Sequence, residues 1–295
     1  MEKDLADWRS AGRISARALE YGRTLIRPGA KLLDASDKIE EKIRALGGEP
    51  AFPAQISLDH NAAHYCADPD DLTIFKDQVC CLDVGAHVNG AIGDNALTVD
   101  LSGKHQDLVQ AARDALDNAV AIIRPGITLG EIGKTIQETI QKAGFAPIKN
   151  LSGHGLDRYQ VHTPPQIPNF DSGETATLEE GMIIAIEPFA TTGRGLIKET
   201  DTANIFSMEQ PRPVRNPLAR KLTKELTELR GLPFTSRWLT RKYPAFKVAF
   251  ALKELSQHHV IHSYPPLIEV DHGLVAQAEH SLLITEDGNE ILTLS

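Results

Sequence analysis

The sequence has few cysteines, no long apolar run and no excess of positive charge. Its three cysteines, Cys66, Cys80 and Cys81, are an odd number with an adjacent pair, which is a poor framework for disulfides. No apolar run approaches the roughly 18 residues that a membrane span requires. The polar start MEKDLADWRS also lacks the basic and apolar regions of a signal peptide. These absences argue against a membrane protein and a disulfide-rich secreted protein, and they predict a cytoplasmic one.

Negative charge predominates over the chain as a whole, but not in every part of it. The formal net charge at pH 7 is −9, which argues against specific nucleic-acid binding. The segment 211–247 is the exception, because it holds ten lysines and arginines against two glutamates. A solvated helical face is the ordinary explanation of such a segment, and a contact with the ribosome is the alternative.

The chain contains an internal duplication with an offset of 97 residues. Ile26-Arg27-Pro28-Gly29 recurs as Ile123-Arg124-Pro125-Gly126. Four further positions match at the same offset: Leu32, Ile39, Ile43 and Gly47 fall on Leu129, Ile136, Ile140 and Gly144. A solenoid repeat would be only about 20–50 residues long. The duplication therefore predicts two related half-domains packed about a pseudo-twofold axis.

Each copy predicts the same order of elements. A helix at 7–26 or 105–123 precedes the Arg-Pro-Gly turn, and a second helix with apolar residues three and four apart follows it and ends near a glycine. Strands come next: 52–58, 78–88 and 92–101 in the first copy, and 148–153, 181–190 and 281–294 in the second. Helices that flank mostly antiparallel strands make an α+β fold.

The segment 208–268 fits neither copy. It contains two helical patterns, 218–231 and 246–260, interrupted by Pro233 and Pro244. We therefore expect a main domain formed by 1–207 and 269–295, with an inserted helical subdomain at 208–268. The insertion also carries the basic excess.

Two aspartates interrupt the otherwise apolar hairpin LDVGAHVNGAIGDNALTVD. Its Asn89-Gly90 pair is typical of a type I′ turn, in which both residues need positive φ. That turn opposes Asp83 to Ala96 and Asp94 to Gly85, so both carboxylates lie on one face, diagonal to each other at roughly 7–8 Å between backbones. The hairpin contains no lysine or arginine to neutralise them. A divalent metal is therefore favoured over an ion pair.

The second copy offers further ligands for a metal. His154 follows Gly153 at a predicted strand end, Glu187 lies within the apolar run IIAIEPFA, and Glu279 stands at the head of another strand. A lone histidine is weak evidence, but a buried glutamate is costly without a partner. Four carboxylates and one imidazole suit two divalent ions of Mn, Fe(II), Co or Zn. Two such ions, roughly 3.5–4 Å apart, can share carboxylates and activate a bridging water as hydroxide.

Together these five segments resemble the methionine aminopeptidases, whose fold is called pita-bread, and the resemblance covers essentially the whole chain. The ligand order Asp, Asp, His, Glu, Glu is matched, with eleven residues from Asp83 to Asp94. The span of 92 residues from Glu187 to Glu279 resembles the type 2 enzymes, which carry a helical insertion there. The start of the chain resembles the archaeal enzymes, which lack a charged N-terminal extension.

The resemblance implies an activity and a ligand for each metal. The enzyme would remove the N-terminal methionine of nascent proteins and peptides, by attack of a metal-activated hydroxide on the first peptide bond. Asp83 would bind one metal, His154 and Glu187 the other, and Asp94 and Glu279 would bridge both. We expect a monomer in the cytoplasm, with ribosome contact through 211–247 as a further prediction.

The resemblance also implies residues that meet the substrate. His64 in NAAHY and His162 in RYQVH would contact the scissile amide as catalytic and substrate-binding residues, and Glu187 would pass the proton. Phe52 and Pro53 would line the methionine pocket, although plain core packing explains them equally well. Three positions depart from the pattern of the family: Asn95 beside the second aspartate, Ala278 before the last glutamate, and Thr163-Pro164 after the second histidine.

Two other functions remain open from the sequence. A prolidase-like X-Pro dipeptidase has the same fold, but such chains usually carry a further N-terminal domain. A non-catalytic homologue that binds the ribosome or nucleic acid would use the basic insertion. Such homologues lose metal ligands, whereas all five are present in this sequence.

Overall fold

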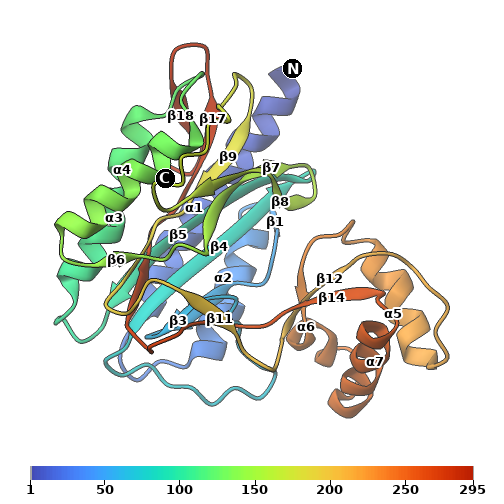
Figure 1. Ribbon diagram of the computed structural model, residues 1–295. Coiled ribbons are helices and arrows are strands. Elements are labelled where there is room, and N and C mark those ends of the chain that lie inside the picture. The colour runs from blue at the N-terminus through green and yellow to red at the C-terminus, as the bar shows by residue number, and fades with distance from the viewer. Residues whose placement is uncertain (1, 295) are drawn as a thin grey trace.

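Residues 2–294 are described by a computed structural model. Helices α1 to α4 and most of the strands form a main body, and α5, α6 and α7 lie together to one side of it (Figure 1). No helix within residues 2–294 is both long and apolar enough to cross a membrane.

The first half is built on the predicted hairpin. Strands β4 (Val79–Val88) and β5 (Ala91–Asp100) pair in the predicted register, with Asp83 opposite Ala96 and Asp94 opposite Gly85. Helices α1 (Glu2–Leu25) and α2 (Leu32–Ala45) pack against the face that carries Leu82 and Val84. The short strands β1 (Glu49–Pro50) and β2 (Gln55–Leu58) pair with β4. Because side chains alternate along a strand, both aspartates face away from these helices.

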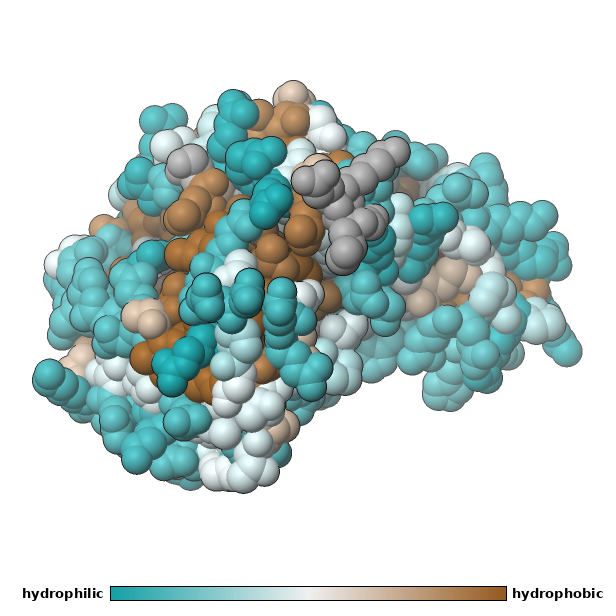
Figure 2. Space-filling view, turned by 90° about the horizontal axis from the view of Figure 1, so that it is seen from above, coloured by the Kyte–Doolittle hydropathy of each residue, from teal (hydrophilic) through white to brown (hydrophobic). Residues whose placement is uncertain are grey.

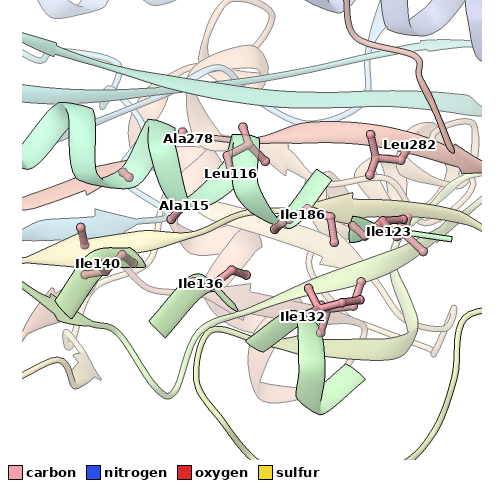
Figure 3. Packing of buried hydrophobic residues seen from close by; sticks show 14 of the residues in the cluster. Ala115, Leu116, Ile123, Ile132, Ile136, Ile140, Ile186, Ala278 and Leu282 are labelled. Carbon is pink, nitrogen blue, oxygen red and sulfur yellow. The ribbon is translucent and has the colours of Figure 1, made fainter. Parts of the chain in front are cut away.

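The second half repeats this arrangement. Helices α3 (Gln106–Ile122) and α4 (Leu129–Lys142) pack on an antiparallel sheet, in which Ile132 and Ile136 lie near Ile186 and Leu282 of the strands (Figure 3). The strand order is β18-β17-β9-β7-β8. The bounds are β7 (Ser152–Asp157), β8 (Gln160–Pro168), β9 (Ile183–Ile186), β17 (His280–Ile284) and β18 (Asn289–Ile291).

Short strands connect the halves. One small sheet has the order β16-β10-β6 and another β11-β15-β3. Their bounds are β3 (Asn61–Ala63), β6 (Ala146–Pro147), β10 (Phe189–Thr191), β11 (Ile197–Glu199), β15 (Leu267–Glu269) and β16 (Val275–Gln277). A backbone bridge joins Ala96 to Glu279, and the backbone N–H of Asp94 donates to Ser281 Oγ at 2.8 Å. These bonds fix the aspartate hairpin against the strand that follows Glu279.

Four predicted strands are shorter or divided in the structure. The predicted strand 52–58 begins only at Gln55 and the predicted strand 148–153 only at Ser152, and 281–294 is the hairpin of β17 and β18 around an Asp-Gly turn. The predicted strand 181–190 is split into β9 and β10 at Glu187-Pro188. Proline has no N–H to donate to a neighbouring strand, which explains the break.

The inserted segment has a core of its own, and its strands pair with β12 (Ile205–Met208), which lies just before it. Helices α5 (Pro217–Thr227), α6 (Ser236–Thr240) and α7 (Ala245–Gln257) pack around Leu222, Leu226 and Leu255. Strands β12, β13 (Phe234–Thr235) and β14 (Ile261–Tyr264) form a sheet in the order β13-β12-β14. These strands are only two to four residues long, too short for a clear alternating pattern. The surface of this lobe is mostly hydrophilic in Figure 2.

A buried ion pair fixes the insertion to the first half. The Arg237 guanidinium of α6, only 2% exposed, donates to the Glu40 carboxylate of α2 at 2.6 and 3.2 Å. Glu40 is fully buried and also accepts from Trp238 Nε1 at 2.7 Å and from the Ala54 backbone N–H at 3.3 Å. These bonds hold α6 against the segment that leads into β2.

Candidate metal centre and catalytic cavity

A cavity of about 250 Å³ lies between the two halves and the insertion. It is lined by all five predicted metal ligands and by three of the four predicted substrate residues: Asp83, Asp94, His154, Glu187 and Glu279, with His64, His162 and Phe52. The remaining lining residues are Gln55, Ala63, Asn150, Leu151, Ser152, Val161, Phe189, Ile205, Pro233, Tyr264 and Leu267. The duplication therefore brings together acidic residues that lie up to 196 positions apart in the chain.

The ligand atoms of this cluster lie close together. One ligand atom each from Asp94, His154 and Glu279 falls within 4.8 Å of the other two. His154 Nε2 is 3.4 Å from Glu187 Oε1 and 3.9 Å from Asp94 Oδ2. His154 Nδ1 lies 3.2 Å from the Gly155 carbonyl oxygen, to which it can donate its proton. That hydrogen bond leaves the Nε2 lone pair directed at the carboxylates, as a metal-binding histidine requires.

The carboxyl groups are in an environment that disfavours their charge. Burial raises the pKa of Asp94, Glu187 and Glu279 well above their usual values, and the neighbouring carboxylates raise them further. Asp83 keeps part of its surface open to the cavity, yet desolvation raises its pKa to about 7. Burial lowers the pKa of His154 to about 3, so its imidazole is neutral at pH 7.

The residues present fit a pair of divalent cations. Among residues 2–294, no lysine or arginine forms an ion pair with these four carboxylates. Asp83 Oδ1 and Asp94 Oδ1 are buried without a hydrogen-bond partner, which is costly unless a cation is bound there. Four carboxylates balance the charge of two divalent ions, and the oxygen-rich donor set with one imidazole suits Mn, Fe(II), Co or Zn.

Two further histidines lie at this cavity. Burial lowers the pKa of His64 to about 4, and its Nδ1 is buried without a hydrogen-bond partner. Its backbone has a φ of 61° and donates its N–H to Gln55 Oε1 at 2.7 Å. An uncommon conformation held in this way is typical of functional sites. The exposed ring of His162 meets the His154 ring edge-on, with 4.5 Å between the ring centroids.

The predicted methionine pocket is only partly reproduced. Phe52 lines the cavity and packs so closely on Gly85 that a Cβ there would lie 2.2 Å from its ring. Val161 and Ile205 extend this apolar wall. Pro53 is buried but is not among the described residues that line the cavity.

The sequence analysis missed the contribution of the insertion to the cavity. Pro233 and Tyr264 line it, although both lie in the segment 208–268. The Tyr264 ring meets the His64 ring edge-on at 5.7 Å between centroids, and its hydroxyl lies 3.0 Å from Ser207 Oγ. Neither residue belongs to a motif, so only the pairing of β12 with β13 and β14 reveals them.

Supporting residues behind the ligands were also missed. Gln277 Nε2 donates to Glu187 Oε2 at 3.4 Å, and buried Asn169 donates to the Glu187 carbonyl at 3.2 Å. Asn95 has its carboxamide on the core side, where Oδ1 lies 2.7 Å from Ser15 Oγ of α1. This contact explains a polar residue that the sequence alone left without a role. Ala278 packs in the core of the second half.

Comparisons with known proteins agree with this arrangement. The sequence pattern of metallopeptidase family M24 matches residues 6–286. A methionine aminopeptidase of Methanocaldococcus jannaschii is 45% identical over 285 residues, which are 96% of each chain. One from Archaeoglobus fulgidus is 44% identical over the same share of both chains. The crystal structure of a methionine aminopeptidase from Thermotoga maritima has a TM-score of 0.74 and 26% identity, covering 100% of this chain and 98% of that one.

Proposed function

The chain belongs to metallopeptidase family M24 and acts as a methionine aminopeptidase, and we propose that five of its side chains hold the two divalent metal ions of the reaction. Asp83 would hold one ion, His154 and Glu187 would hold the other, and Asp94 and Glu279 would serve both. The observation that supports this most strongly is the convergence of these five groups in one cavity without a neutralising lysine or arginine among residues 2–294.

The metal ions, when bound, supply Lewis acidity and lower the pKa of a water so that it can attack a peptide carbonyl. The protein groups orient the substrate and move protons. The apolar wall formed by Phe52, Val161 and Ile205 takes the methionine side chain and excludes water. His64 and His162, on neighbouring parts of the same cavity, hold the scissile amide by hydrogen bonds.

Glu187 has a second role in this proposal. Its carboxylate accepts a hydrogen bond from Gln277 and lies 3.4 Å from His154 Nε2, so it stays in one orientation. Its carboxylate lines the cavity beside the other proposed ligands, within reach of a water held there. It therefore takes a proton from the attacking water and passes it to the leaving amine.

The substrate experiment compares two kinds of peptide. Purified protein is loaded in turn with Mn²⁺, Fe²⁺, Co²⁺ or Zn²⁺ and given Met-Gly, Met-Ala and X-Pro dipeptides. We expect release of methionine from the first two and little cleavage of the third. Cleavage of X-Pro dipeptides alone would instead favour the prolidase-like function, and no cleavage of any peptide with any metal would favour the non-catalytic homologue.

We also propose where the enzyme works. We assign residues 208–268 to an inserted subdomain. Its basic segment 211–247 binds the ribosome, where nascent chains emerge. Arg220 and Lys224 of α5 are exposed and available for contact with phosphates. The three cysteines are buried and free, which is consistent with a reducing cytoplasm. The site is formed by one chain, so we propose a monomer, which light scattering can test.

The ribosome contact is tested by sedimentation with ribosomes at rising salt. Association should weaken with salt and should be lost in the double variant Arg220→Glu and Lys224→Glu. Lys134→Glu, on the exposed side of α4 in the second half, is the matched control and should leave it unchanged. Association that is insensitive to salt, or none in the wild type, would refute this part of the proposal.

A further inference from the structure

A second cavity of about 360 Å³ lies beside the catalytic one. The two share a wall formed by Asn150, Leu151 and Ser152, which line both. We call the second cavity the downstream groove; its other lining residues are Lys149, Gln166, Pro168, Phe170, Ser172 and Glu174. It lies along the loop before β7, the edge strand β8 and the segment that follows β8.

The shared wall is held in a fixed position. The Asn150 side chain accepts from the Ile197 backbone N–H at 2.9 Å and donates to the Ile197 carbonyl at 2.8 Å. Asn169, which is fully buried, donates from Nδ2 to the carbonyl oxygens of Leu151 and Glu187, at 3.2 Å each. One side chain therefore ties the wall of the downstream groove to a proposed metal ligand. Such a link gives the two cavities a constant relative position.

We propose that the downstream groove binds the third and later residues of the peptide substrate. This inference rests on the proposed function, in which the first residue occupies the apolar wall and the first peptide bond lies at the metal centre. A peptide advances roughly 3.3 Å per residue when extended, so its third residue lies roughly 7 Å beyond the methionine. The shared wall offers a continuous path from one cavity to the next, which makes the remainder of the substrate the occupant that fits the groove.

The groove has a definite chemistry. Pro168 and Phe170 are half-buried and give it an apolar floor. The Lys149 ammonium lies 6.0 Å from the centre of the Phe170 ring, and no ion pair of Lys149 is found among residues 2–294. Glu174 accepts from the Ala176 backbone N–H at 3.0 Å. The apolar floor favours an apolar side chain at the third position of the substrate. The Lys149 ammonium favours an acidic side chain over a lysine at the fourth position.

The kinetic test uses amidated peptides of two lengths. Met-Gly-NH₂ is compared with Met-Gly-Phe-Asp-NH₂ and Met-Gly-Phe-Lys-NH₂, in the wild type and in Phe170→Ala and Lys149→Glu. The longer acidic peptide should have a kcat/KM about fivefold or more above the dipeptide, and Phe170→Ala should remove most of that gain. Lys149→Glu should move the Asp-over-Lys preference by about two- to fivefold, as expected of an exposed charge pair.

Matched controls separate the groove from general damage. Phe246→Ala and Lys142→Glu change an exposed phenylalanine and an exposed lysine outside the groove and should alter none of these ratios. In the groove variants, kcat/KM for Met-Gly-NH₂ should stay at the wild-type value. An equal loss with both peptide lengths, or no gain with length in the wild type, would overturn the inference.

A binding measurement keeps this test independent of turnover. A fluorescent Met-Gly-Phe-Asp peptide with a reduced first amide bond cannot be cleaved, and its dissociation constant is measured by anisotropy. Phe170→Ala should weaken this binding severalfold, and unchanged binding would overturn the groove. If the wild type binds this peptide in a Phe170-dependent way but does not release methionine from Met-Gly-NH₂, the proposed function fails and the groove stands.

Discussion

The buried pair of Arg237 and Glu40 leads to a large and specific prediction about stability. Arg237→Met removes the guanidinium and leaves the Glu40 carboxylate, which is fully buried, without a cation. Trp238 Nε1 and the Ala54 N–H still donate to it, but neither carries a charge. Removing one partner of a buried ion pair costs about 3–5 kcal/mol, so the free energy of unfolding should fall by that amount.

A second substitution makes the reasoning refutable. Adding Glu40→Gln to Arg237→Met removes the unpaired charge while keeping an acceptor for the two remaining donors. The double variant should therefore lose only about 1–3 kcal/mol, the cost of imperfectly satisfied buried groups, and be more stable than Arg237→Met alone. Arg241→Met is the control, because the Arg241 side chain is 44% exposed in its pair with Asp37 and should contribute less than about 1 kcal/mol.

The assay is urea unfolding followed by circular dichroism at pH 7. A loss below about 1 kcal/mol for Arg237→Met would show that the buried pair does not hold the insertion against α2. A double variant that is less stable than the single one would show that the penalty does not come from an uncompensated carboxylate.

Three other predictions concern the site and its supports. Asn95→Ala should lower the free energy of unfolding by about 0.5–1.5 kcal/mol in urea, because the Ser15 hydroxyl loses one of its two buried acceptors and keeps the Val84 carbonyl, and no loss of stability would contradict this. In the metal-free folded protein the pKa of Asp83 is raised to about 7. Between about pH 4 and 7 the folded protein therefore keeps a proton on Asp83 that the unfolded chain has lost, and its stability falls as the pH rises through this range. Asp83→Asn should therefore raise the melting temperature of metal-free protein at pH 8 more than at pH 5, and an equal effect at both would exclude that shift. Tyr264→Ala should lower kcat/KM on Met-Gly about tenfold or more, because His64 loses its packing partner, whereas Tyr264→Phe should stay within about twofold; equal losses would instead assign the effect to the hydroxyl.

The parts that were predictable from the sequence are those with a local rule behind them. The Asn89-Gly90 turn determines which residues of the hairpin oppose each other, and the structure has that register. The duplication likewise places helices before strands in both halves. Helix α4 follows from the periodic isoleucines at Ile132, Ile136 and Ile140 that meet the sheet in Figure 3.

The parts that were not predictable depend on contacts between distant segments. Tyr264 reaches the cavity only because β14 pairs with β12, and no nearby residue reports that pairing. Asn169 and Gln277 support Glu187 from different strands, and neither stands in a pattern that marks it. The downstream groove likewise exists only once β7 and the segment after β8 lie side by side.

The central claim is that Asp94 and its four partners hold two metal ions that the reaction requires. The most direct measurement counts metal per chain by mass spectrometry and follows methionine release from Met-Gly and Met-Ala, in reconstituted wild type, in Asp94→Ala and in wild type with a chelator. We predict two ions and rapid release in the first, and fewer ions with release lowered by at least about a hundredfold in the other two. Equal release in all three would contradict the two-metal site.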